Sequence, residues 1–291
     1  MRGACARLPL LRHAQDANIT PTRAPIPRRL RRAAALSTSA LVPRHSVQRL
    51  DKLTIKIYAD GADVEGIRSI GSLPHVKGFT TNPMLMRRAG ISDYKSFALD
   101  VLRVVNGRPV SFEVLADEFG EMEAQALEIA SWGSNVNVKI PVTNTRGVSS
   151  APLVRRLSAR GVACNVTAIF TLEQVKEIVE ALSETTPAIL SVFAGRIADT
   201  GIDPMPLMRQ AVAVARSKPK AEVLWASPRE ILNIFQADEV GCHIITVTND
   251  VLKKLSRVGK DLAAFSLETV EMFHDAARAA GYTIALPEVP R

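Results

Sequence analysis

Cysteine and histidine are scarce in this sequence, and their spacing argues against disulfides and metal sites. The three cysteines, Cys5, Cys164 and Cys242, lie far apart and form no Cys-X-X-Cys pair, and the five histidines are equally scattered. Such spacing predicts neither a disulfide framework nor a zinc site. We therefore expect a reducing compartment, the cytoplasm, and no bound metal.

Long apolar runs and nucleotide-binding motifs are also lacking. Apolar residues make up 47% of the chain, but no run of them approaches the roughly 20 residues of a membrane-spanning helix. No G-X-G-X-X-G or G-X-X-X-X-G-K motif follows a candidate strand, which argues against a nucleotide site. A soluble chain with an ample core and no membrane partner is expected.

The formal charge of +8 invites a nucleic-acid partner, but its distribution argues against one. Residues 1–50 contain ten arginines, no lysine and a single acid, Asp16. The rest of the chain holds 27 basic and 28 acidic residues, so it is close to neutral. The basic segment has no Phe, Tyr or Trp on which bases could stack, and no nucleic-acid partner is expected.

Residues 1–50 are expected to stand apart from the folded chain. Their Arg-rich, acid-poor composition, with Pro, Ser and Ala, resembles a transit peptide for a mitochondrion or plastid. The alternative, which the weak helical period favours, is upstream sequence translated from a mis-called start codon. Both interpretations predict disorder, and both leave residues 51–291 as the functional domain.

From residue 52 onward, short apolar runs alternate with amphipathic stretches. The predicted strands lie at about 54–59, 77–80, 110–115, 136–140, 163–167, 188–193, 222–226 and 243–247. The predicted helices lie near 63–71, 93–105, 119–132, 148–160, 171–182, 204–217, 228–237, 249–255 and 261–280. Eight such units with Val/Ile-rich strands predict a single-domain (β/α)8 TIM barrel with an extra C-terminal helix. An open doubly wound sheet is the alternative.

The stretch Asn135–Thr143, N-V-N-V-K-I-P-V-T, carries the central candidate. With a strand period of two, Val138 and Ile140 face one side and Lys139 faces the other, which is the inside of the barrel. Confinement disfavours an ammonium ion, so the lysine pKa should fall and a nucleophilic amine should become available. A lysine that reaches out to water near the strand end is the alternative.

The same period places further polar residues on the inward faces of other strands. They are Asp60, Glu113, Asn165 and Thr167, with Ser191 and Phe193 falling together on the sixth strand. Buried polar groups are costly unless they satisfy one another, so several together indicate a site. Active sites of barrels lie at the carboxyl ends of the strands.

Several candidate residues also have a purely structural interpretation. Asp60 fits a turn or a helix cap, Asn82-Pro83 fits a helix start, and Glu113 fits an ion pair with an arginine. The sequence Ser227-Pro228-Arg229-Glu230 fits a capping box at a helix N-terminus. Free amides at such a helix start, with Arg229 and Arg196 close by, would also suit a phosphate.

A neutral lysine among acids, without metal ligands, indicates Schiff-base chemistry on a ketone or aldehyde. The iminium withdraws electrons, so a neighbouring carbon–carbon bond can break while a carboxylate takes the hydroxyl proton. Water held by Glu113 and Thr167 would serve the proton transfers. The lysine itself is the electron sink, so no cofactor is expected.

Six motifs in order show that residues 54–285 resemble the transaldolase family, particularly its shorter members, which include fructose-6-phosphate aldolase. The motifs are Y-A-D-G-A-D (58–63), G-F-T-T-N-P (78–83), V-K-I-P-V-T (138–143), N-V-T-A-I-F (165–170), S-V-F-A-G-R-I-A-D (191–199) and W-A-S-P-R-E (225–230). The resemblance implies a (β/α)8 barrel with Lys139 as the Schiff-base lysine on the fourth strand.

The resemblance also implies a role for each remaining site residue. Asp60 would be the acid/base for the substrate hydroxyl, and Glu113 with Thr167 would hold the catalytic water. The implied substrate-binding residues are Thr81, Asn82, Asn165, Ser191, Phe193, Arg196, Ser227 and Arg229, of which the last three would hold the phosphate. Family members usually carry a longer A-S-F-(R/K) stretch where Ser227 here runs directly into Pro228-Arg229.

Glu113 and Phe193 resemble the transaldolase choices, whereas the aldolase branch resembles Gln and Tyr at these positions. The resemblance therefore implies transfer of a dihydroxyacetone unit between sugar phosphates in the pentose phosphate pathway. The alternatives are an aldolase that releases free dihydroxyacetone and a non-catalytic sugar-phosphate-binding barrel. Short family members are often ring-like assemblies, so a homo-oligomer is also implied.

Overall fold

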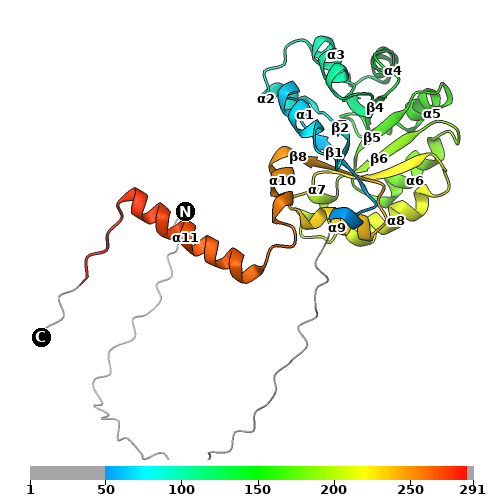
Figure 1. Ribbon diagram of the computed structural model, residues 1–291. Coiled ribbons are helices and arrows are strands. Elements are labelled where there is room, and N and C mark those ends of the chain that lie inside the picture. The colour runs from blue at the N-terminus through cyan, green and yellow to red at the C-terminus, as the bar shows by residue number, and fades with distance from the viewer. Residues whose placement is uncertain (1–49, 287–291) are drawn as a thin grey trace, which may run out of the picture. The chain divides into compact units, whose positions relative to one another are not determined.

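The computed structural model describes residues 50–286, in which eight parallel strands form a closed barrel in the order β1 to β8 (Figure 1). The strands are β1 (Lys56–Asp60), β2 (Val76–Thr80), β3 (Val110–Glu113), β4 (Val136–Pro141), β5 (Cys164–Ile169), β6 (Ala188–Val192), β7 (Ala221–Trp225) and β8 (Ile244–Thr248). Strand β8 pairs with β1 from Lys56 opposite Ile244 to Asp60 opposite Thr248, and this pairing closes the barrel. The predicted (β/α)8 barrel is confirmed, and an open sheet is excluded.

Helices follow the strands along the chain. They are α1 (Val64–Gly71), α2 (Pro83–Arg88), α3 (Tyr94–Val104), α4 (Phe119–Ala130), α5 (Ala151–Ala159), α6 (Leu172–Ala181), α7 (Ala194–Ala198), α8 (Met205–Ala215), α9 (Leu232–Glu239), α10 (Asn249–Leu252) and α11 (Leu262–Ala280), with 3₁₀ turns η1 (Leu50–Lys52) and η2 (Lys253–Arg257). The short helices α2 and α7 were not predicted as separate elements. Both follow strand ends directly, so they shape the mouth of the barrel.

The core between barrel and helices comes from the aliphatic face of each strand. Val138, Ile140 and Val166 are fully buried there, and helical residues such as Leu157 and Ile178 pack in the same cluster. Each fully buried Val, Leu or Ile side chain contributes about 1.5–3 kcal/mol to stability. This face therefore stabilises the barrel and leaves the inner face free for polar residues.

A second, smaller cluster fills the inside of the barrel below its mouth. It contains Tyr58, Ile189, Leu224 and Ile244, each of which lies two residues before an inward-facing residue nearer the carboxyl end of its strand. Gly78 makes room for the tyrosine, because a Cβ at this position would lie 2.6 Å from the Tyr58 ring. The barrel is thus closed by side chains at this level, and the space above them is open.

Helix α11 follows the eighth strand–helix unit, as predicted. Asp261 caps its start by accepting a hydrogen bond from the Ala264 N–H at 2.9 Å, and Gly281 ends it in the left-handed conformation. None of its residues is buried, and Leu267 and Phe273 are 59% and 65% exposed. Its apolar side chains thus lack cover within the described part of the chain.

Other predictions concern the termini, the cysteines and the membrane. The disorder predicted for residues 1–50 falls almost entirely outside the described residues. Cys164 and Cys242 are free and buried, and burial raises the pKa of each thiol to about 12. Within residues 50–286, no helix is both long and apolar enough to cross a membrane.

Candidate active site

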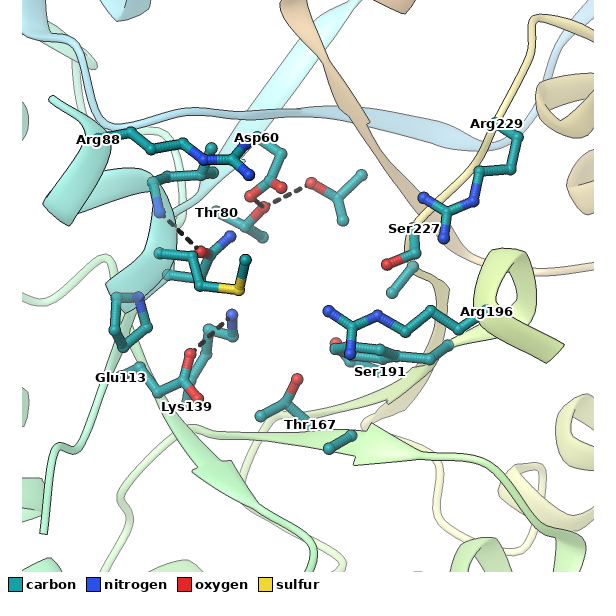
Figure 2. A pocket seen from close by; sticks show the side chains of 18 residues that line it. Asp60, Thr80, Arg88, Glu113, Lys139, Thr167, Ser191, Arg196, Ser227 and Arg229 are labelled. Atoms are coloured by element: carbon teal, nitrogen blue, oxygen red, sulfur yellow. Dashed lines mark hydrogen bonds and ion pairs between the residues drawn. The ribbon is translucent and has the colours of Figure 1, made fainter. Parts of the chain in front are cut away.

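A cavity of about 440 Å³ opens at the carboxyl ends of the strands. Every strand or its first following residue contributes to its wall, through Asp60, Thr80, Glu113, Lys139, Thr167, Ser191, Ala226 and Thr246. The loops and short helices above add Asn82, Met84, Arg88, Phe193, Arg196, Ser227 and Arg229 (Figure 2). The period of two along the strands therefore brings all the predicted inward-facing groups except Asn165 to the wall of one cavity.

Lys139 lies at the centre of the polar wall, with only 7% of its surface exposed. Its Nζ donates to the backbone carbonyl of Thr81 at 2.9 Å and lies 3.1 Å from Glu113 Oε2. Glu113 and Lys139 are register partners in the neighbouring strands β3 and β4, which explains their contact. Glu113 therefore pairs with the lysine, not with an arginine, and the alternative in which Lys139 reaches out to water is excluded.

Asp60 ends β1 and lies inside the same wall. Its Oδ1 accepts a hydrogen bond from the Thr80 hydroxyl at 2.7 Å. Burial is the largest influence on its pKa and raises it, with a smaller push from the Glu113 charge; Lys139 and the Thr80 hydrogen bond act in the opposite direction. The cap of α1 is Asp63, so the turn or cap role considered for Asp60 is not the observed one.

Thr167 presents an unsatisfied hydroxyl to the cavity. Its Oγ1 is buried and has no hydrogen-bond partner within residues 50–286. The pairing of β5 with β6 shifts register between Val166 and Ile169, and Ala168 at this irregularity has a φ of 59°. A left-handed alanine costs about 1–2 kcal/mol, so the strand is held in a strained bulge beside the cavity. A buried hydroxyl without a partner is ready for a ligand or water.

Two predicted substrate-binding residues, Asn165 and Thr81, are buried behind the residues that line the cavity. Asn165 is fully buried; it donates to Ser111 Oγ at 2.9 Å and accepts from Ser191 Oγ at 2.6 Å. Thr81 is also fully buried and donates its hydroxyl to the Ser111 carbonyl at 3.2 Å. The Thr81 carbonyl oxygen accepts the hydrogen bond from Lys139, and the substrate-binding role of Thr81 stays a prediction.

Asn82 caps a helix, as the structural interpretation expected, and it also lines the cavity. Its side chain caps α2 by accepting a hydrogen bond from the Leu85 N–H at 3.0 Å, and Pro83 occupies the first helical turn. Asn82 also lines the cavity, where its amide group remains available as a donor. The cap fixes the side chain, so the donor is held in place before any ligand arrives.

The two predicted phosphate arginines lie across the cavity from Glu113 and Lys139 (Figure 2). Arg196, on α7, stacks over the Phe193 ring at 5.1 Å. Arg229 pairs with Asp199: its Nε donates to Asp199 Oδ1 at 2.9 Å, and a second contact joins Nη2 to Oδ2. This salt bridge lowers the pKa of Asp199 and raises that of Arg229. The two guanidinium groups give this side of the cavity its positive charge.

The capping box predicted at Ser227 is wrong. Helix α9 begins only at Leu232, and Ser227 adopts a left-handed φ of 59°. Asn233 Oδ1 accepts the N–H groups of Arg229 and Glu230 at 2.8 and 3.1 Å, so these amides are not free for phosphate. The Ser227 hydroxyl and the arginine side chains remain as the phosphate candidates.

The turn at Ser227 is fixed by contact with α7. A Cβ on Gly195 would lie 1.5 Å from the Ser227 carbonyl oxygen, so only glycine permits this approach. The Gly195 N–H also donates to the Ala226 carbonyl at 3.2 Å. The two loops that carry Arg196 and Arg229 are thereby locked together.

Sequence reasoning missed several residues of the wall and its support: Thr80, Thr246, Arg88, Met84 and Ser111. The period of two would have placed Thr80 and Thr246 inside the barrel, but threonine is common in strands and gave no separate signal. Arg88 is an exposed arginine at the end of α2, a helix whose start at Asn82-Pro83 was considered but whose length was not predicted. Within residues 50–286, no three His, Cys, Asp or Glu side chains gather as metal ligands.

The chain is similar to one protein family over most of the barrel. Residues 57–285 match the family model described as transaldolase/fructose-6-phosphate aldolase. A probable transaldolase of Dehalococcoides mccartyi is 36% identical over 202 residues, which cover 69% of this chain and 90% of the relative.

Two further relatives show the same extent of similarity. A probable transaldolase of Streptococcus equi subsp. zooepidemicus is 34% identical over 203 residues, covering 69% of this chain and 90% of the relative. Probable transaldolase 2 of Listeria monocytogenes is 36% identical over 202 residues, covering 69% and 88%. The family match, residues 57–285, includes all the residues that line the cavity.

Proposed function

We propose that this chain, which belongs to the transaldolase/fructose-6-phosphate aldolase family, is a transaldolase. It would transfer a dihydroxyacetone unit from a ketose phosphate, fructose 6-phosphate or sedoheptulose 7-phosphate, to an aldose phosphate. The single observation that carries the proposal is the buried amine of Lys139, 3.1 Å from Glu113 and facing a cavity lined by cations.

The first half of the reaction uses the contacts around Lys139. Glu113 is within hydrogen-bond distance of Nζ and can take its proton, which frees the amine to attack the ketose carbonyl. Water leaves the resulting carbinolamine with a proton delivered through Glu113, and a water bridging to the unpaired Thr167 hydroxyl would serve this transfer. The product is an iminium at C2.

The second half breaks and remakes a carbon–carbon bond. Asp60 takes the proton of the C4 hydroxyl, the C3–C4 bond breaks, and its electron pair moves to C3 and the iminium. The released aldose phosphate leaves, while the three-carbon enamine stays on Lys139. Attack of C3 on the acceptor aldehyde, with return of the proton by Asp60, forms the new ketose, which water then releases from the lysine.

The substrate phosphate would lie against Arg196, Arg229 and the Ser227 hydroxyl, across the cavity from the lysine. An arginine fork suits a phosphate because it offers paired N–H donors. The Asp199 salt bridge holds the Arg229 side chain in place before binding. Such pre-organisation lowers the entropy lost on binding.

Arg196→Gln is expected to raise KM for fructose 6-phosphate by about 10- to 100-fold, because a hydrogen bond to a charged group contributes about 1.5–3 kcal/mol. Steady-state kinetics checks this, with Arg209→Gln, an exposed arginine on α8, as the matched control. A fall in kcat with an unchanged KM would contradict the role in phosphate binding.

The function itself is tested by a transfer assay with and without an acceptor. With fructose 6-phosphate and erythrose 4-phosphate, we expect sedoheptulose 7-phosphate and glyceraldehyde 3-phosphate in equal amounts. Without the acceptor, we expect no turnover beyond the first enamine, because Phe193 lacks the hydroxyl that would help release it. Sustained formation of free dihydroxyacetone would favour the aldolase alternative, and no turnover with either mixture would favour a binding protein.

We propose further that the chain acts as a homo-oligomer. The support is the apolar surface of α11, where Leu267, Val270 and Phe273 are 59%, 60% and 65% exposed. Exposed apolar side chains at this density are typical of a surface that a partner covers. Sedimentation equilibrium of the full chain is expected to give a multiple of 31.6 kDa, and a monomer at micromolar concentration would reject the proposal.

A further inference from the structure

Two threonine hydroxyls form a chain that ends on Asp60. Thr80 Oγ1 donates to Asp60 Oδ1 at 2.7 Å, and Thr80 Oγ1 and Thr246 Oγ1 are 2.5 Å apart. Thr80 and Thr246 are only 3% and 7% exposed. They belong to β2 and β8, the two strands that pair with β1, so they approach Asp60 from both sides.

The direction of the two hydrogen bonds follows from counting the hydrogens that the hydroxyls carry. A threonine hydroxyl carries one hydrogen, and that of Thr80 is used in the bond to Asp60. While Asp60 is ionised, the hydrogen between the two threonines therefore comes from Thr246. Hydrogen bonds in series polarise one another, so donation by Thr246 strengthens donation by Thr80 to the carboxylate.

The hydrogen bond from Thr80 makes the two oxygens of the Asp60 carboxylate different. Oδ1 is occupied by Thr80, whereas no donor contacts Oδ2 within residues 50–286. Asp60 lines the cavity, so Oδ2 is the oxygen available to a substrate hydroxyl. A carboxylate held at one oxygen cannot rotate freely, and its second oxygen keeps a fixed direction.

Charged groups face Asp60 from several elements. Lys139 on β4 and Glu113 on β3 lie in the same wall, and Arg88, Arg196 and Arg229 line the cavity above it. Burial and Glu113 disfavour the ionised carboxylate, while Lys139 and the Thr80 hydroxyl favour it. The hydroxyl chain thus offsets part of the cost of keeping a base at this buried position.

We propose that Thr246 is a positioning residue for Asp60, acting through Thr80 to hold the carboxylate in the orientation and ionisation state that proton transfer requires. The inference rests on the proposed function, because it assigns Asp60 as the group that exchanges the hydroxyl proton. It adds a residue of the cavity wall that acts on the reacting carboxylate through Thr80.

Kinetics of Thr246→Val tests the proposal, because valine keeps the shape of threonine and removes the hydroxyl. We expect kcat to fall about three- to tenfold, the range for losing one hydrogen bond, with KM within about twofold of wild type. Asp60 must be ionised to take the proton, and a weaker donor raises its pKa, so the acidic limb of the kcat profile should move to higher pH. Thr246→Ser should restore both values.

Thr248→Val is the matched control, since Thr248 lies on the same strand, is exposed and makes no cap hydrogen bond. It should leave the pH profile unchanged. A Thr246→Val enzyme with the wild-type profile would overturn the proposal. So would a lowered melting temperature without a shift of the acidic limb, because that indicates a merely structural role.

A titration that needs no turnover separates this inference from the proposed function. Carbon-13 NMR of aspartate-labelled protein, with the Asp60 signal assigned through Asp60→Asn, reports the carboxyl pKa directly. A higher pKa in Thr246→Val than in wild type supports the hydroxyl chain, and equal values overturn it. An inactive wild-type chain would reject the transaldolase function, and this titration would still decide the role of Thr246.

Discussion

Lys139→Met is expected to lower kcat/KM for sugar-phosphate transfer by about 10⁴-fold or more, the scale for losing a catalytic nucleophile. Methionine has a similar length but no amine, so neither the carbinolamine nor the iminium can form. The cavity and its arginines are unchanged, and substrate should still bind. Initial rates at several substrate concentrations, together with binding by calorimetry, separate the two effects.

The controls for this variant address other lysines and folding. Lys95→Met removes an exposed lysine that pairs with Glu128 at 2.7 Å, and it should leave activity unchanged. Lys139→Met leaves the Glu113 carboxylate without its partner. Loss of one partner of a buried ion pair destabilises a protein by about 3–5 kcal/mol. The double variant with Glu113→Gln removes that unpaired charge, so it should be folded and equally inactive. Activity within tenfold of wild type in either variant would contradict the Schiff-base mechanism.

Asp60→Asn is expected to lower kcat by about 10²–10⁴-fold, the usual contribution of a general acid–base residue. The asparagine can still accept the Thr80 hydrogen bond, so the wall should keep its shape. The step that fails is removal of the C4 hydroxyl proton, and iminium formation on Lys139 should survive. Borohydride trapping with fructose 6-phosphate should therefore still label the variant, and loss of trapping together with turnover would place Asp60 in the earlier step instead.

The same variant is expected to be more stable than wild type at neutral pH. The pKa of Asp60 is raised above its ordinary value of 3.8, chiefly by burial. Between 3.8 and the folded-state pKa, the folded chain binds more protons than the unfolded chain, so wild-type stability falls as pH rises through this window. Asparagine does not ionise, so the stability of Asp60→Asn does not fall with pH for this reason.

Urea denaturation at a series of pH values measures the difference. The free energy of unfolding of Asp60→Asn minus that of wild type should increase as pH rises above 3.8 and then level off. A difference that is constant over the series would show that the Asp60 pKa is not raised by folding. Many catalytic residues are unfavourable for stability in this way, which is the usual trade-off between stability and activity.

The sequence was sufficient for the barrel and for most of the polar wall. Both depend on a local property, the period of two along each strand, which decides the faces of Asp60, Glu113, Lys139 and Thr167 without knowledge of their neighbours. Closure of the barrel then brings these strand ends together. Strand boundaries were right to within about two residues at most ends for the same local reason.

Contacts between distant parts of the chain could not be predicted. The sequence at Ser227 satisfies every local rule for a capping box, but contact with Gly195 imposes a left-handed turn and delays α9 to Leu232. The pairing of Arg229 with Asp199, thirty residues earlier, has no local signal. These contacts depend on how the loops after β6 and β7 pack, and only the folded chain specifies that.

The threonines below Asp60 illustrate a second limit. Threonine favours strands for its shape alone, so Thr80 and Thr246 look like ordinary strand residues in the sequence. Their proposed role depends on the distance from the Thr80 hydroxyl to the Asp60 carboxylate and on the distance between the two hydroxyls. These distances join different strands, so a pattern along one strand cannot reveal them.

Borohydride trapping in the presence of fructose 6-phosphate, followed by mass mapping of the modified peptide, tests the central claim most directly. The full chain and Lys95→Met should each acquire one stable adduct, on the peptide that contains Lys139, and Lys139→Met should acquire none. An adduct on another lysine, or no adduct on the folded wild-type chain, would contradict the account of Lys139 as the Schiff-base residue.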